Sequence, residues 1–176
     1  MNVVSLSGSP SADSRSSRLL RFVERRLAGQ VGATHHLSLR DLPAADLLAA
    51  RAELPVLRQA IERVREADLV LVATPIYKAA YSGLLKVFLD LLPADALHGK
   101  QVLPLATGGS PAHLLALEYA LKPVLSALGA RHILDAVYVT DSQWRPHEFF
   151  GAAPDADVVA RIDAALCGLR QPLAAA

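Results

Sequence analysis

Leu69-Val70-Leu71-Val72-Ala73 is the stretch that decides the fold, because all five of its residues are apolar. A run this short and this uniformly apolar is typical of a central parallel strand covered on both faces. The residues after it, Thr74-Pro75-Ile76-Tyr77, form a predicted loop that is too apolar for ordinary surface. Pro75, Ile76 and Tyr77 are therefore candidates to line a flat heteroaromatic ligand, although local packing explains Ile76 and Tyr77 equally well.

Strand and helix patterns alternate on both sides of this strand. The predicted strands are residues 3–7, 34–39, 69–73, 101–107 and 133–139. The predicted helices are residues 16–28, 55–66, 79–92, 111–128 and 155–169, with a loop at 151–154 and a frayed tail at 171–176. Five strands alternating with five helices predict a parallel sheet with helices on both faces. Rossmann-like and flavodoxin-like topologies both satisfy this pattern, and both bind ligands beyond the carboxyl ends of the strands.

Composition narrows the class of protein. The chain has 176 residues, 52% hydrophobic and 20% charged, which indicates one globular domain over 1–176. Its single cysteine, Cys167, excludes an intramolecular disulfide and a Cys-rich metal site and suits a reducing cytoplasm. A net charge of +1 does not predict nucleic acid or anionic membrane as a partner. The sequence shows no signal peptide and no apolar run near the ~20 residues of a membrane span, so we expect a cytoplasmic protein.

The loop after the first predicted strand, Gly8-Ser9-Pro10-Ser11-Ala12-Asp13-Ser14-Arg15-Ser16-Ser17, carries five serines and one arginine. Hydroxyls and free N–H groups at a helix N-terminus favour an anion, and Arg15 adds a charge-assisted partner for phosphate. The loop lacks the lysine of a Walker A motif and the three glycines of the dinucleotide fingerprint. The simpler alternative is an N-cap at Ser16 or Ser17 within a polar surface loop.

The loop after the fourth predicted strand is Thr107-Gly108-Gly109-Ser110-Pro111. Two glycines permit close approach of a ligand to the backbone, or an unusual turn. Ser110 and Pro111 suit the start of a helix, and His113 nearby is better explained by structure than by catalysis. The three loops together offer a phosphate cradle, an apolar wall and a glycine floor. Flavin mononucleotide, FMN, has one phosphate and one flat ring system, and it therefore matches a site with a phosphate cradle beside an apolar wall and a glycine floor.

Several of these stretches resemble the NADPH-dependent FMN reductase family. They are Gly8-Ser9-Pro10, Ser14-Arg15-Ser16-Ser17, the run from Ala73 to Gly83, and Leu105-Ala106-Thr107-Gly108-Gly109. The run from Ala112 to Leu128 is similar to the SsuE group of alkanesulfonate-utilisation flavin reductases within that family. Two departures are Ser11, where many relatives have Arg, and residues 144–154, which match no family pattern.

The resemblance implies a flavodoxin-like five-stranded sheet of order 2-1-3-4-5. It further implies reduction of FMN, as a substrate or loosely bound cofactor, by NADPH or NADH. A homodimer or homotetramer is expected, which would pass reduced FMN to an FMNH2-dependent alkanesulfonate monooxygenase. Since the flavin N5 accepts the hydride, neither a catalytic side chain nor a metal is expected. The implied binding residues are Ser9, Ser14, Arg15 and Ser16 for the phosphate, Pro75, Ile76 and Tyr77 beside the ring, and Thr107, Gly108 and Gly109 at its polar edge.

Pro123 is the main anomaly in the predicted helix 111–128. A proline inside a helix has no N–H and clashes with the carbonyl four residues earlier, here that of Tyr119, so a kink or π-bulge is expected there. Relatives in the SsuE group carry a tyrosine that forms a π-helix at a subunit interface, and Tyr119 matches it. The predicted helix 79–92 is also apolar nearly all round, which favours burial in an oligomer. Our hypothesis is that Tyr119 disfavours permanent retention of FMN.

Three alternative functions use the same fold. An NAD(P)H:quinone or azo reductase would hold FMN tightly. A flavodoxin-type electron carrier usually presents an acidic surface, which a pI of about 8.0 opposes. A receiver domain needs acidic Mg²⁺ ligands after the first strand, where this chain has Gly8-Ser9-Pro10.

Overall fold

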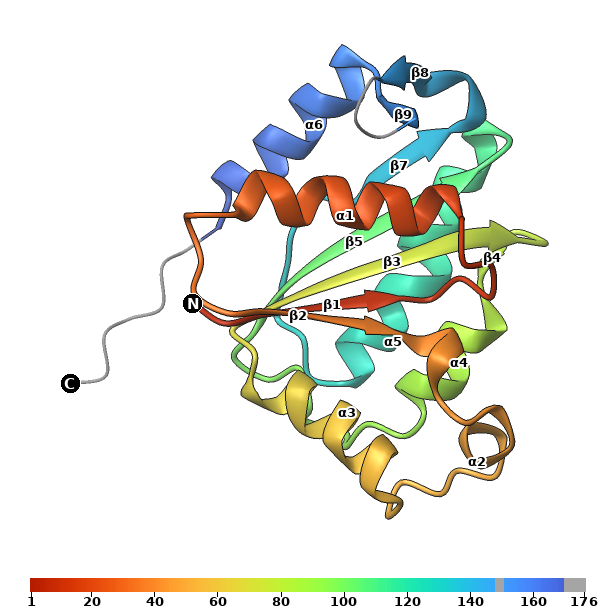
Figure 1. The fold of residues 1–176 in the computed structure, drawn as a ribbon, viewed down its shortest axis with the longest axis vertical. Helices are drawn as coiled ribbons and strands as arrows, with labels where there is room; N and C mark the ends of the chain where they lie inside the picture. Colours follow the sequence, from red (N-terminus) through yellow and green to blue (C-terminus); the bar gives the residue numbers. More distant parts are fainter. Residues whose placement is uncertain (148–150, 170–176) are drawn as a thin grey trace.

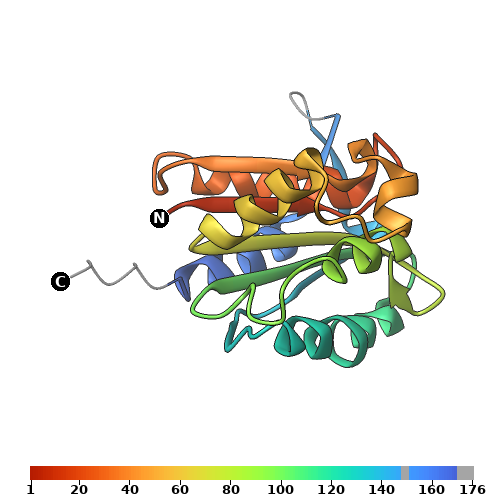
Figure 2. The same ribbon diagram turned by 90° about the horizontal axis from the view of Figure 1, so that it is seen from below.

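The structure, a computed structural model, describes residues 1–147 and 151–169. A parallel sheet runs through its centre (Figure 1). Four strands lie side by side in the order β2 (Thr34–Ser38), β1 (Val3–Ser7), β3 (Leu69–Tyr77) and β5 (Gln101–Gly108), which Figure 2 shows from below. Two short strands, β6 (His132–Ile133) and β7 (Val137–Thr140), pair with β5 on its far side. The first strand therefore lies between the second and third, which confirms the flavodoxin-like order and excludes the Rossmann-like one.

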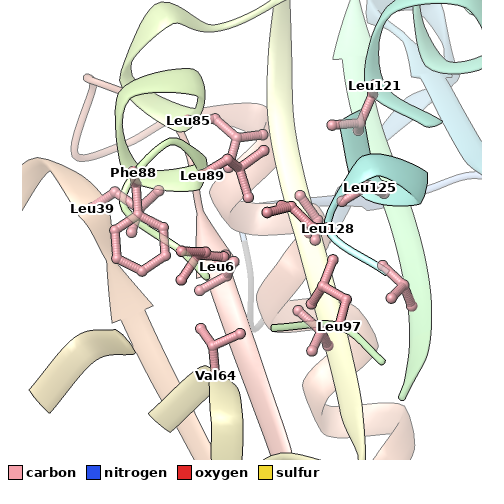
Figure 3. Close-up of a cluster of buried hydrophobic side chains, with 14 of the residues drawn as sticks. Leu6, Leu39, Val64, Leu85, Phe88, Leu89, Leu97, Leu121, Leu125 and Leu128 are labelled. Atoms are coloured by element: carbon pink, nitrogen blue, oxygen red, sulfur yellow. The ribbon is translucent and has the colours of Figure 1, made fainter. Parts of the chain in front are cut away.

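Helices cover both faces of the sheet because its central strands, β3 and β5, are mostly apolar and buried on both sides. Alternate residues of β3 face opposite ways, so Leu69 and Leu71 enter one apolar cluster and Val70 and Val72 enter the other. The first cluster packs under α1 (Arg15–Leu27) and α6 (Ala156–Cys167). The second packs under α3 (Pro55–Glu66), α4 (Gly83–Leu89) and α5 (Lys122–Ala127). Figure 3 shows the second cluster, in which Phe88 is fully buried.

The prediction of five strands is wrong in number, since the sheet has seven strands within the described residues. The predicted strand 133–139 is interrupted and gives β6 and β7. The predicted loop 74–77 is instead the end of β3, which turns back into β4 (Ala80–Tyr81). Lys78 and Ala79 make this turn with positive φ angles of 50° and 61°. The predicted helix 79–92 therefore begins only at Gly83, after Ser82 caps it by accepting a hydrogen bond from the Leu85 N–H.

The predicted single helix 111–128 is three successive segments. These are a 3₁₀ turn, η2 (Pro111–Leu114), a π-helix, η3 (Leu117–Leu121), and then α5. The Lys122 N–H donates to the Leu117 carbonyl, five residues back, which is the π-helical bond. The widened turn lies directly before Pro123, which has no N–H to continue the ladder. Tyr119 lies in this turn with 79% of its surface exposed.

The other predicted helices are confirmed within a residue or two, the helix 55–66 among them. Asp155 caps α6 by accepting from the Val158 N–H at 3.0 Å. The predicted loop at 151–154 is wrong, because β9 (Gly151–Pro154) pairs antiparallel with β8 (Trp144–His147). The predicted tail at 171–176 lies outside the described residues. The remaining elements are two 3₁₀ turns, η1 (Leu39–Asp41) and η4 (Asp141–Gln143), and a short α-helix, α2 (Ala44–Leu48).

Candidate functional site

The predicted loops meet at the carboxyl edge of the sheet. They enclose a cavity of about 230 Å³, whose lining includes seven of the ten predicted cofactor-binding residues. The lining residues are Arg15, Pro75, Ile76, Tyr77, Thr107, Gly108, Gly109 and Asp141. Ser9, Ser14 and Ser16 do not line it. Ser9 and Ser14 lie in the adjoining loop after β1, and Ser16 lies in the first turn of α1. Two other hollows, of about 260 and 430 Å³, lie beside α1 and beside β7, and neither is lined by residues of all three loops.

The loop after β1 is organised by a network of hydroxyls. Ser14, rather than Ser16 or Ser17, caps α1, because its Oγ accepts from the Ser17 N–H at 3.0 Å. The same Oγ lies 2.7 Å from Ser17 Oγ and 3.1 Å from Ser16 Oγ. Ser17 in turn contacts Ser7 Oγ at 2.8 Å, and Ser9 is buried. Hydroxyls therefore gather at the N-terminus of a thirteen-residue helix whose first turn holds no acidic residue, an arrangement that favours an anion.

Gly8 holds this loop against the centre of the sheet. Its N–H donates to the Ala73 carbonyl at 2.8 Å, and its own carbonyl accepts from the Ser82 hydroxyl. A Cβ at Gly8 would lie 2.9 Å from Leu85 Cβ, closer than real Cβ atoms come. The glycine is therefore required for close packing of the loop on β3 and α4.

The apolar wall is the hairpin of β3 and β4. Ile76 is 7% exposed and packs in the core, and it also lines the cavity, so local packing holds this residue in place at the wall. Tyr77 is 50% exposed at the rim of the cavity and is available to a ligand. Thr74 Oγ1 donates to the Pro75 carbonyl at 2.9 Å and accepts from the Ser82 N–H at 3.0 Å, which fixes the hairpin to the start of α4.

The two glycines after β5 have different roles. A Cβ at Gly108 would come within 3.0 Å of the Tyr138 hydroxyl, so the first glycine makes room for that tyrosine. The Tyr138 hydroxyl donates to the Ser110 carbonyl at 2.7 Å, and its pKa is raised by burial and, less strongly, by the charge of Asp141. At Gly109 a Cβ would meet nothing within 4 Å, which leaves its backbone open to a ligand. His113 does not line the cavity.

Asp141 is the lining residue that sequence reasoning missed. Its Oδ1 accepts from Arg15 Nη1 at 2.7 Å, which joins the loop after β1 to the turn after β7. Both side chains are about half exposed, at 52% for Arg15 and 48% for Asp141. Its position in the sequence could have revealed it. Asp141 directly follows the last strand of the sheet, and a residue there must lie at the same carboxyl edge as the other site loops.

The donor set fits a ligand that carries both a phosphate and a flat ring. Arg15 supplies a cationic donor in the cavity lining, and the hydroxyls of the loop after β1 adjoin it. Tyr77 supplies an aromatic side chain, and a Cβ at Gly109 would meet nothing within 4 Å. Such pockets bind a ligand by apolar contact over most of its surface and by a few polar groups that fix its orientation.

Comparisons with known proteins show the family to which the chain belongs. A family model described as NADPH-dependent FMN reductase matches residues 1–145. The chain is 54% identical over 143 residues to the "FMN reductase (NADPH)" of Escherichia coli (strain K12), covering 81% of this chain and 75% of that one. A protein of the same name from Pseudomonas putida KT2440 is 50% identical over 143 residues, covering 81% and 73%. A solved structure, the apo form of an NADH:FMN oxidoreductase (EmoB), matches with a TM-score of 0.85 and 40% identity, covering 97% of this chain and 91% of that one.

Proposed function

This chain belongs to the NADPH-dependent FMN reductase family, and we propose that it supplies reduced FMN to a separate FMNH2-dependent alkanesulfonate monooxygenase in sulfur acquisition. The chemistry itself, reduction of FMN by NAD(P)H, follows from the family and from relatives named as FMN reductases. No helix in the described part of the chain has the length and apolar character needed to cross a membrane. The proposed setting is the cytoplasm.

The observation that carries the proposal is the cavity at the strand ends, which is lined by Arg15 and by the end of β3 in the β3–β4 hairpin. In the proposed complex Arg15 holds the flavin phosphate together with Ser9, Ser14 and Ser16. Pro75, Ile76 and Tyr77 flank the ring. Thr107, Gly108 and Gly109 present backbone groups to its polar edge.

FMN supplies the hydride acceptor when bound, so the task of the protein is to bind and orient. Arg15 fixes one end of the flavin, and the rigid hairpin fixes the plane in which the ring lies. No side chain has to donate or accept a proton for the hydride to move. Loss of a binding residue is therefore expected to raise the FMN concentration that gives half-maximal turnover, rather than to abolish turnover.

Partial exposure of the site supports FMN as a substrate that comes and goes. Tyr77 and Arg15 each keep about half of their surface in solvent. The reduced flavin can then leave for a second enzyme.

The π-helical turn supports a role for Tyr119 at an oligomer interface. Its ring is exposed, and Leu114 and Leu115 nearby are exposed as well, at 43% and 58%. Together these three side chains form an apolar surface that a second copy of the chain would cover. In the proposed homodimer or homotetramer, this contact disfavours permanent retention of FMN.

The interface proposal is tested with two variants of one residue. Tyr119→Ala is expected to retain FMN through purification, whereas Tyr119→Phe keeps the ring and should release FMN as the parent does. Size-exclusion chromatography with light scattering reports the oligomeric state of each protein. Release of FMN by Tyr119→Ala as readily as by the parent contradicts the proposed role.

The reaction is tested on the full chain after removal of bound flavin. We expect oxidation of NADPH or NADH to require added FMN, and sulfite to be released from an alkanesulfonate when the monooxygenase is also present. A purified protein that is yellow with stoichiometric flavin and reduces quinones or azo dyes favours the alternative reductase instead. Arg15→Ala is expected to weaken FMN binding by about 1–3 kcal/mol, the scale of a charge-assisted hydrogen bond.

A further inference from the structure

We propose that the Asp141 carboxylate competes with the flavin phosphate for Arg15 and thereby sets how loosely FMN is held. This inference rests on the proposed binding of the phosphate by Arg15. It concerns Asp141, a lining residue outside the predicted site, which follows β7 whereas the phosphate loop follows β1.

The contact occupies the cation that the phosphate needs. Arg15 Nη1 donates to Asp141 Oδ1 at 2.7 Å, a charge-assisted bond between residues 126 positions apart in the chain. A phosphate monoester can take both prongs of the guanidinium fork, and it carries about −1.5 to −2 charge at pH 7 against −1 for a carboxylate. The phosphate therefore replaces Asp141 as the partner of Arg15, but only after the existing ion pair has opened.

The ion pair is able to open because both side chains are half exposed. Exposed ion pairs contribute little, equivalent to a factor of at most about five in an equilibrium constant. Their side chains also exchange readily with water, so Arg15 can turn toward a ligand without disturbing the core.

Asp141 itself stays at the cavity when Arg15 leaves. It begins the turn η4, whose capping residue Thr140 donates its N–H to Gln143 Oε1 at 3.0 Å. Thr140 also lies opposite Gly108 in the pairing of β5 with β7, which fixes the turn beside the glycine floor. The released carboxylate then remains near a bound phosphate and repels it, which adds a further factor of about two to three against binding.

The test measures Kd for FMN and for riboflavin, which lacks the phosphate, by flavin fluorescence quenching with the full chain freed of flavin. Asp141→Asn is expected to bind FMN about three- to tenfold more tightly and riboflavin within twofold of the parent. The gain should shrink at high ionic strength, because screening weakens the remaining repulsion. An unchanged or weakened FMN affinity, or an equal gain for riboflavin, overturns the inference.

Asp163 offers a matched control. It lies in α6, outside the phosphate loop, and its Oδ1 accepts from Arg26 Nε at 2.9 Å, an Arg–Asp pair that does not line the cavity. Asp163→Asn removes the same charge from a pair of the same kind, and its FMN affinity is expected to stay within twofold of the parent. A gain equal to that of Asp141→Asn would mean a general charge effect and would overturn the competition.

Arg15→Ala separates failure of the inference from failure of the proposed function. If Arg15 binds the phosphate, Arg15→Ala weakens FMN but not riboflavin. Adding Asp141→Asn to it then restores only the factor of about two to three that comes from relieved repulsion, because no cation is left to compete for. If Arg15→Ala leaves FMN binding unchanged, both the phosphate assignment and the competition are wrong. If Arg15→Ala weakens FMN but Asp141→Asn has no effect, only the competition is wrong. Circular dichroism of each variant checks that it is folded.

Discussion

Replacing Gly108 by Ala should destabilise the protein through one identifiable contact. The added Cβ would come within 3.0 Å of the Tyr138 hydroxyl, which is held by its 2.7 Å bond to the Ser110 carbonyl. Overpacking of this kind typically costs about 1–3 kcal/mol. Alanine also lowers the conformational entropy of the unfolded chain, which stabilises the folded state by about 0.4–1 kcal/mol. The free energy of unfolding should therefore fall by about 1–2 kcal/mol in total.

The cause can be isolated by removing the hydroxyl. Tyr138→Phe alone loses one hydrogen bond and about 1 kcal/mol. In the double variant the nearest atoms to the new Cβ are Tyr138 Cζ at 3.3 Å and Ile76 Cβ at 3.5 Å, distances that a small shift relieves. The double variant should therefore be about as stable as Tyr138→Phe, which corresponds to a coupling of about 1–2 kcal/mol.

Urea unfolding followed by circular dichroism measures all four proteins of this cycle. Gly109→Ala is the control, because a Cβ there would meet nothing within 4 Å, and its stability should change by less than about 0.5 kcal/mol. Additive effects of Gly108→Ala and Tyr138→Phe, within about 0.5 kcal/mol, would refute the assignment of the clash to the hydroxyl.

Three further predictions concern stability away from the site. Ala50, after α2, has a φ of 53°, which strains an alanine backbone, so Ala50→Gly should raise the free energy of unfolding by about 0.5–1 kcal/mol. A urea midpoint lower than that of the parent would contradict this strain. Phe88 is fully buried, so Phe88→Ala should lower the free energy of unfolding by about 3–5 kcal/mol, and a loss below 1 kcal/mol would contradict its burial. A hydrogen bond from Arg26 lowers the pKa of Asp163, so this pair stabilises the fold above about pH 3.8 and ceases to do so as pH falls through the lowered pKa. NMR titration of the Asp163 carboxyl should show its pKa returning toward 3.8 in Arg26→Ala, and an unmoved pKa would contradict the pairing.

Local sequence signals predicted those elements whose ends are set by nearby residues. Pro55 begins α3 and Gly29 follows α1 with φ 83°, and both effects act over one or two residues. The hairpin at Lys78 and Ala79 was missed because neither residue favours a positive φ. That turn exists because Ile76 pairs with Tyr81 and because Ser82 is held by Thr74 and Gly8, contacts that a helical pattern does not reveal.

The sequence by itself determined the alternation of strands and helices, the buried central strand and the edge of the sheet at which the candidate loops meet. These follow from side-chain periodicity and from turn residues, which act within one element or between chain neighbours. Only the tertiary structure decided that Asp141 meets Arg15 and that Gly108 makes room for Tyr138. Both contacts join segments far apart in the chain, and their geometry depends on the register of β7 against β5, which no local pattern encodes.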